Sequence, residues 1–143
     1  MPDITTPRPI PAPATRTVAV VLAGGSGQRI GLATPKQLLK IAGKTILEHT
    51  LTIFERAERV DEVIVMMNPG FVTDAQNIVD RAGLAKVTQV IPGGTSRNAT
   101  TQLALDALAH LPAPTTNVLF HDAVRPMLSQ RIIEDCVTAL ETH

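Results

Sequence analysis

Apolar residues along this chain gather in four short runs, at residues 17–23, 63–67, 87–91 and 117–120. In the first two runs, valine and other apolar residues follow one another without alternating polar positions. This pattern is typical of strands buried on both faces of a parallel sheet. Glycine and proline end the first three runs, as expected where a strand gives way to a turn. The pattern therefore predicts four buried strands.

The segments between and after these runs show helical spacing, with apolar residues recurring every three or four positions. In residues 45–58, Leu47, Leu51 and Phe54 share one face, and Thr45 is placed to cap the first turn. The other helices are predicted over residues 71–82, from 96 to just before 112, and from 129 onward.

Strands and helices thus alternate from residue 17 onward, with short connections between them. This order predicts an α/β fold: a Rossmann-like, three-layer α/β/α sandwich with a parallel sheet, right-handed crossovers and helices on both faces. Residues 1–16 contain five prolines and no apolar run, which is typical of a disordered, polyproline-like tail and not of a secretory signal. Residues 17–143 are therefore expected to form one domain.

Composition restricts the partners of that domain. Lys plus Arg and Asp plus Glu both number 13, so no overall field attracts nucleic acid or a membrane, and any anion site must be local. The single cysteine, Cys136, excludes an internal disulfide and fits the reducing cytoplasm. No stretch approaches the roughly 18 apolar residues that a membrane span needs.

The loop after the first strand has the residues of a phosphate site. Gly24, Gly25 and Gly27 let the backbone bend sharply and approach a ligand closely, so that their N–H groups can point at phosphate oxygens. Arg29 and Lys36 add two positive charges nearby, one suited to a bidentate grip and the other to bridging phosphate oxygens.

Two better-known phosphate loops fit this sequence poorly. A P-loop requires Gly-Lys-Ser/Thr four residues after its first glycine, and Arg29 stands at that offset from Gly24. A dinucleotide fingerprint requires a third glycine where Ile30 stands and an acidic residue after the second strand, where the chain has Met67 and Asn68. A degenerate dinucleotide-binding domain stays open as an alternative, as does a simple glycine-rich turn with solvated cations.

The loops after the third and fourth strands carry further candidates. Gly94 and Thr100 flank the start of a helix, where N–H groups favour an acceptor or an anion, and they are candidates for contact with a base and a ribose. A glycine turn with a serine cap is the plainer interpretation. Asp122 directly follows the fourth strand and is well placed to hold Mg²⁺. Arg125 is equally suited to pairing with Asp122 and to touching substrate, and His121 is more typical of a structural histidine than of a metal ligand.

With these loops together, the chain resembles the polyol-phosphate cytidylyltransferases, which include the methylerythritol-phosphate and ribitol-phosphate enzymes. The resemblance runs from about residue 17 to the end of the sequence. The motifs that carry it are Leu22-Ala23-Gly24-Gly25-Ser26-Gly27-Gln28-Arg29, Pro35-Lys36-Gln37, Gly93-Gly94-Thr95-Ser96-Arg97 and His121-Asp122-Ala123-Val124-Arg125-Pro126.

The resemblance implies a sheet of the nucleotidyltransferase type and transfer of CMP from CTP to a polyol phosphate, with release of pyrophosphate and with Mg²⁺ as cofactor. It also implies a role for each matching residue. Arg29 and Lys36 would be catalytic, Asp122 would hold the metal, and the CTP-binding residues would be Ala23, Gly24, Gly25, Gly27, Gly93, Gly94, Arg97 and Thr100.

The resemblance also bears on the acceptor and on the rest of the protein. Leu-Ala-Gly-Gly at residues 22–25 and Val124 favour the ribitol-phosphate branch slightly. Family members continue beyond the length of this sequence, with a dimer-forming arm and, in some ribitol-type enzymes, a fused reductase, so the chain is expected to be an N-terminal portion of a homodimeric protein. A nucleotidyltransferase for another NTP and a non-catalytic nucleotide-binding fragment are the alternatives.

Overall fold

The computed structural model of the protein describes residues 16–24, 34–109, 116–125 and 129–142. The predicted tail at residues 1–16, apart from Arg16, lies outside these ranges, as do the predicted site residues Gly25, Gly27 and Arg29. The larger elements, in order, are β1 (Arg16–Ala23), α1 (Ile46–Glu55), β4 (Glu62–Met67), α2 (Val72–Ala82), β5 (Val87–Pro92), α3 (Arg97–Ala107), β6 (Thr116–Asp122) and α4 (Gln130–Thr142). The four predicted strands and four predicted helices are confirmed.

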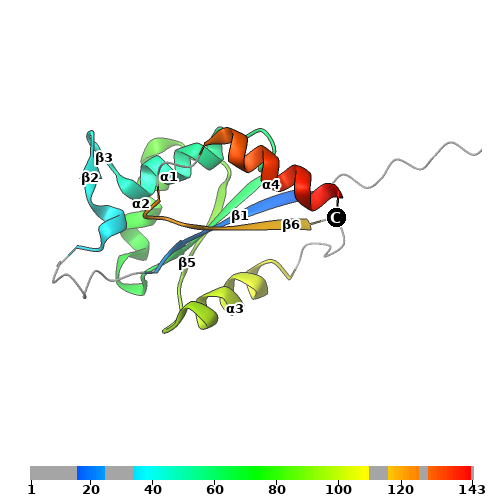
Figure 1. Ribbon diagram of the computed structural model, residues 1–143. Helices are drawn as coiled ribbons and strands as arrows, with labels where there is room; N and C mark the ends of the chain where they lie inside the picture. Colours follow the sequence, from blue (N-terminus) through cyan, green and yellow to red (C-terminus); the bar gives the residue numbers. More distant parts are fainter. Residues whose placement is uncertain (1–15, 25–33, 110–115, 126–128, 143) are drawn as a thin grey trace, which may run out of the picture.

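The four long strands form one sheet in the order β5-β4-β1-β6, and every neighbouring pair is parallel. The chain first moves outward from β1 to β4 and β5, and then returns to the other side of β1 to form β6. Right-handed crossovers in opposite directions place their helices on opposite faces of a sheet. Accordingly, α1, α2 and α4 cover one face and α3 covers the other (Figure 1). The predicted three-layer sandwich is confirmed.

Alternation along the strands divides the core into two parts. Val18 and Val20 of β1 pack on the α3 side, whereas Ala19 and Val21 pack on the side of α1, α2 and α4. Because both sets are fully buried, β1 is apolar at nearly every position, as the sequence indicated. The larger core beneath the three helices includes Leu47, Leu51, Phe54, Val63, Val65, Ala75, Ile78, Ile133 and Val137.

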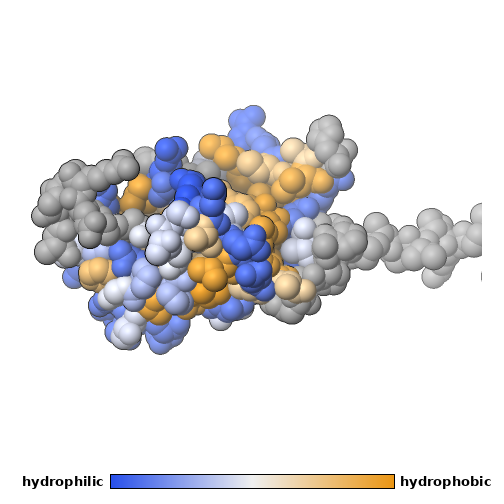
Figure 2. All heavy atoms as spheres, turned by 90° about the horizontal axis from the view of Figure 1, so that it is seen from below, coloured by the Kyte–Doolittle hydropathy of each residue, from blue (hydrophilic) through white to orange (hydrophobic). Residues whose placement is uncertain are grey.

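The α3 side of the sheet is less completely covered. Figure 2 views the molecule from this side and shows apolar surface between polar side chains. Leu103 and Leu105 of α3 are 40% and 45% exposed, and Phe120 of β6 is 43% exposed. Phe120 lies on this side because it pairs with Val20. No helix within the described ranges is long and apolar enough to cross a membrane.

Four short elements were not predicted from the sequence: η2 (Lys36–Leu38), β2 (Lys40–Ile41), β3 (Lys44–Thr45) and η3 (Pro69–Phe71). Strands β2 and β3 form a hairpin in which Ile41 pairs with Lys44. The two residues of its turn, Ala42 and Gly43, have φ values of 53° and 82°, which is the combination that two-residue hairpin turns require. This hairpin connects Lys36 and its neighbours to the start of α1.

Candidate functional site

The strands of the sheet end together at one edge, which brings the three predicted loops into one region. The register pairs Leu22 with Asp122, Ala23 with Met67, and Met67 with Pro92. Neighbouring strands lie about 4.8 Å apart, so the loop at Gly24 is one strand spacing from Asp122 and two from Gly93. Backbone hydrogen bonds keep neighbouring segments paired just past the strand ends. Ala123 N donates to the Leu22 carbonyl oxygen (2.9 Å), and Gly93 N donates to the Met67 carbonyl oxygen (2.7 Å).

This edge contains the point where the chain reverses its direction across the sheet. The crossovers that leave β1 and enter β6 lie on opposite faces, and such a reversal opens a crevice beyond the carboxyl ends of the two strands. Gly24 follows β1 and Asp122 ends β6, so the two residues flank that crevice. The topology therefore supports a ligand site between them.

Lys36 reaches the same edge through η2. The turn begins at Pro35, whose φ is −56°, and Leu38 N donates to the Pro35 carbonyl oxygen at 3.0 Å. The neighbour of Lys36, Gln37, is only 2% exposed, and its Nε2 donates to the Ala23 carbonyl oxygen at 2.6 Å. The exposed Lys36 therefore directly precedes a residue whose side chain is hydrogen-bonded to the end of β1. Sequence reasoning gave Gln37 no role, because nothing local to the sequence shows a bond across 14 positions.

The residues that begin the glycine loop differ in their surroundings. Ala23 is buried, and its carbonyl oxygen accepts hydrogen bonds from Gln37 Nε2 and from Asn68 N at 3.0 Å. Ala23 therefore anchors the loop. Gly24 is exposed, and among the described residues no atom lies within 4 Å of where its Cβ would be. This open space beside the backbone is what close approach of a ligand requires.

The loop at residues 93–100 is held in shape by its own hydrogen bonds. The Thr100 hydroxyl accepts from Gly94 N at 3.0 Å and donates to the Ser96 carbonyl oxygen at 2.9 Å, and Thr100 is 7% exposed. Ser96 Oγ accepts from Ala99 N at 3.0 Å, so the predicted serine cap is confirmed. Arg97, the first residue of α3, is exposed. The described structure thus gives Gly94 and Thr100 a role in shaping the loop.

Packing at Gly94 leads to a stability prediction. A Cβ there would lie 2.6 Å from Ala99 Cβ and 3.0 Å from the Ala99 carbonyl carbon. We expect Gly94→Ala to lower the free energy of unfolding by about 1–3 kcal/mol in urea denaturation, since the first turn of α3 must shift to admit the methyl group. The matched control is Gly70→Ala, whose nearest contact is Asn68 Oδ1 at an ordinary 3.5 Å; we expect a change within about 0.5 kcal/mol. Equal effects would contradict the packing argument.

The segment from His121 to Arg125 folds as a compact turn against α1. His121 Nε2 donates to the Arg125 carbonyl oxygen at 2.8 Å, and the His121 ring meets Phe54 edge to face with centroids 5.5 Å apart. The buried Thr50 hydroxyl donates to the Ala123 carbonyl oxygen at 2.8 Å. His121 therefore has the structural role that the sequence favoured. Within the described ranges, no three His, Cys, Asp or Glu side chains gather as a metal site.

Asp122 is half-buried at the end of β6, and its Oδ1 accepts from Val124 N at 3.1 Å. That bond orients the carboxylate. Among the described residues, Arg125 forms no ion pair with Asp122. Of the two interpretations of Arg125 from the sequence, the described structure does not support pairing with Asp122.

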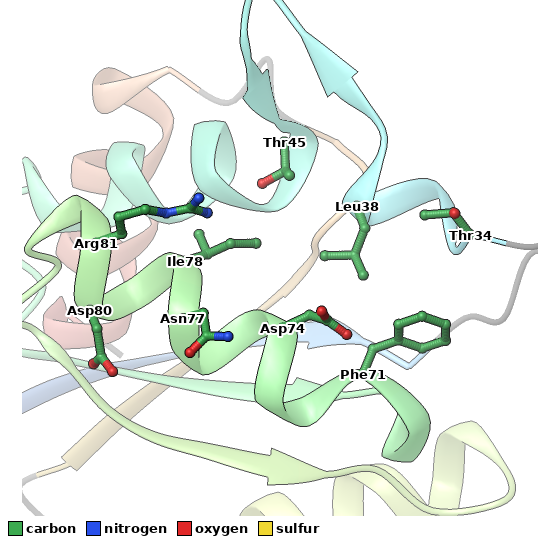
Figure 3. Close-up of a pocket in the computed structure, with 9 residues that line it drawn as sticks. All are labelled: Thr34, Leu38, Thr45, Phe71, Asp74, Asn77, Ile78, Asp80 and Arg81. Carbon is green, nitrogen blue, oxygen red and sulfur yellow. The ribbon is translucent and has the colours of Figure 1, made fainter.

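A groove of about 870 Å³ lies to one side of the site, between α2 and residues 34–45. Figure 3 shows Leu38 pointing across it toward α2, with Phe71 and Asp74 on the opposite wall. Among the described residues, none of those predicted to bind CTP or metal lines this groove. Gly24 and Asp122 lie instead at the strand ends, which form the candidate site.

Comparison with known proteins shows the family of the chain. Residues 17–143 match the family described as IspD, 2-C-methyl-D-erythritol 4-phosphate cytidylyltransferase. The 2-C-methyl-D-erythritol 4-phosphate cytidylyltransferase of Thermobifida fusca is 44% identical over 125 residues, which are 87% of this chain and 50% of that protein. The bifunctional ribulose 5-phosphate reductase/CDP-ribitol pyrophosphorylase Bcs1 of Haemophilus influenzae is 41% identical over 128 residues, 90% of this chain and 27% of that protein.

Among solved structures, the 4-diphosphocytidyl-2C-methyl-D-erythritol synthase of Anaerococcus prevotii superimposes with a TM-score of 0.71 at 27% identity. The superposition covers 88% of this chain and 51% of that one. The chain therefore spans about half the length of the Thermobifida and Anaerococcus proteins. The family match, the sequence identities and the fold agree, and the chain belongs to the 2-C-methyl-D-erythritol 4-phosphate cytidylyltransferase family.

Proposed function

We propose that this chain supplies the nucleotide-binding part of an enzyme that transfers CMP from CTP to a polyol phosphate and releases pyrophosphate. The observation that carries the proposal is the meeting of Gly24, the Lys36 turn and Asp122 at the reversal point of the sheet. An exposed glycine backbone, a cation and a carboxylate in one crevice suit a triphosphate with its metal. Membership of a family of cytidylyltransferases supports CTP as that triphosphate.

The proposed reaction needs no nucleophile from the protein. A phosphate oxygen of the acceptor attacks the α-phosphorus of CTP in line, a new P–O bond forms, and the bond to the leaving pyrophosphate breaks. In such transfers the protein contributes alignment and charge neutralisation. Lys36, together with Arg29, would neutralise the negative charge that builds on the pyrophosphate.

The two sides of the crevice would bind different parts of CTP. The backbone at Gly24 would hold the phosphates, because Ala23, just before it, is bonded to the turn of Lys36 and because β1 pairs with the strand that ends at Asp122. We assign the cytidine end to the loop after β5, which lies two strand spacings from Gly24. Its predicted contacts are Gly93, Gly94, Arg97 and Thr100.

Asp122 fits the requirements of a magnesium ligand. Magnesium in phosphate sites is usually held by one or two carboxylates, with phosphate oxygens and water completing its shell. Asp122 offers one such carboxylate, oriented by Val124 N, beside the place proposed for the phosphates. When bound, the ion would neutralise phosphate charge and so favour attack on the α-phosphorus.

The proposal is tested by pyrophosphate release from the protein as its gene encodes it. CTP with Mg²⁺ is supplied with D-ribitol 5-phosphate or with 2-C-methyl-D-erythritol 4-phosphate, and UTP, GTP and ATP are run in parallel. We expect release with CTP and one of the two acceptors. Preference for UTP or GTP would instead indicate a sugar-phosphate nucleotidyltransferase. A rise in the thermal midpoint with CTP, but no release with either acceptor, would indicate a binding module.

The relatives include both acceptor branches, since one is named for methylerythritol phosphate and another for CDP-ribitol. The name of the Haemophilus protein also includes a reductase activity. We propose a homodimeric cytoplasmic enzyme, as the resemblance to the family implies, and the Haemophilus name makes a fused reductase a feature to be sought in the gene. Light scattering of the purified protein measures the oligomeric state.

A further inference from the structure

The η2 turn has a buried polar anchor that the reaction scheme above does not use. Thr34, Lys36 and Leu39 are exposed, whereas Gln37 is 2% exposed. A glutamine is rarely buried to this degree unless its amide is hydrogen-bonded. The Gln37 Nε2 bond to the Ala23 carbonyl oxygen, at 2.6 Å, meets that requirement and joins two segments 14 residues apart.

The acceptor of this bond is the residue immediately before Gly24. The Ala23 carbonyl oxygen also accepts from Asn68 N, at 3.0 Å. A carbonyl oxygen has two lone pairs, so one atom joins the end of β1 to the segment after β4 and to the η2 turn. Movement of Gln37 relative to Ala23 would therefore change the distance between Lys36 and Gly24.

Local hydrogen bonds cannot replace this link. The bonds from Leu38 N to Pro35 O and from Leu39 N to Lys36 O, both 3.0 Å, maintain the shape of the turn. They do not tie the turn to β1, and the bond from Ile46 N to the Leu39 carbonyl oxygen, at 2.9 Å, ties it to α1 only. The Lys36 side chain is long and flexible, so its ammonium group depends on a fixed backbone for its position.

We propose that Gln37 is a positioning residue, which holds the backbone of Lys36 near Gly24 through the Ala23 carbonyl group. This inference rests on the proposed function, because it assumes that Lys36 acts on the phosphates. A displacement of about 1 Å in a reacting group can lower a rate by about 10²-fold. Loss of the Gln37 bond should therefore lower kcat more than it changes the KM for CTP.

A double-mutant cycle in the full-length protein tests the proposal. Gln37→Leu removes the amide donor, and we expect kcat for pyrophosphate release to fall by about 10- to 10²-fold, in line with a small displacement of Lys36. In a Lys36→Ala background, the same substitution should have almost no further effect, because the group that Gln37 positions is already gone. The matched control is Gln102→Leu, since Gln102 is exposed on α3 and bonds Asp106; it should leave kcat unchanged.

Each outcome of the cycle has one meaning. If the effects of Gln37→Leu and Lys36→Ala multiply, Gln37 acts independently of Lys36 and the inference is wrong. If Lys36→Ala leaves turnover intact, it is the proposed role of Lys36 that has failed. If Gln37→Leu does not fold, the cycle is run with Gln37→Glu, which keeps the size of the side chain and lacks the amide donor; the same two comparisons then decide.

Discussion

An Asp122→Asn variant is expected to lose magnesium-dependent turnover while keeping its fold. Asparagine keeps a side-chain oxygen that can accept the bond from Val124 N, so the turn after β6 has no reason to change. The substitution removes the negative charge that would hold the metal beside the phosphates. We expect kcat to fall by about 10³-fold or more, at or beyond the upper end of what loss of one charge-stabilising group usually costs.

The measurement is pyrophosphate release over a range of MgCl₂ concentrations, with the thermal midpoint recorded for each variant. Asp135→Asn is a suitable control, because Asp135 lies exposed on α4 and pairs weakly with Arg131 at 3.9 Å. It should match the parent protein in both measurements. Unchanged turnover in the Asp122 variant would remove this residue from the site.

A Lys36→Ala variant is expected to lower kcat by about 10²- to 10³-fold, the usual effect of losing one preorganised charge-stabilising group. The loss should appear equally in kcat and in kcat/KM, because the charge on the leaving pyrophosphate develops in the transition state. Lys36 is exposed and has no ion pair among the described residues, so the fold should be unaffected.

Lys40→Ala provides the control for charge alone, since Lys40 is exposed on β2 only four positions along the chain. We expect its steady-state kinetics to match those of the parent protein. A higher KM for CTP with an unchanged kcat in the Lys36 variant would mean that Lys36 binds substrate without stabilising the transition state.

Elements with strong local signals could be predicted from the sequence. The buried strands are continuous apolar runs, and the helix starts are marked by side chains that do cap them: Thr45 Oγ1 accepts from Glu48 N, and Ser129 Oγ from Ile132 N. Gly83 closes α2 in the left-handed conformation, with φ of 66°, directly after the last turn, where glycine is the common helix end. Each of these signals lies within one short stretch of the chain.

Features that depend on distant contacts could not be predicted. Two-residue strands such as β2 and β3 have no periodicity, and the only local sign of their hairpin is Gly43. The bond from Gln37 to Ala23 and the loop bonds of Thr100 exist only once the chain is folded. The placement of Asp122 at the same edge as Gly24 follows from the parallel strand order alone. Contacts of the site residues with CTP remain predictions.

The pairing of β6 with β1 makes the crevice sensitive to the length of one strand. His121 and Asp122 project to opposite faces, because side chains alternate along a strand. If a residue were deleted between Thr116 and His121 and the start of β6 stayed in place, the rest of the strand would move back by one position. Asp122 would then pair with Val21 instead of with Leu22. The carboxylate would then occupy the place of the imidazole beside Phe54, and the imidazole would lie on the other side. Whether the number of residues in β6 before Asp122 is odd or even therefore decides whether the carboxylate or the imidazole reaches the crevice.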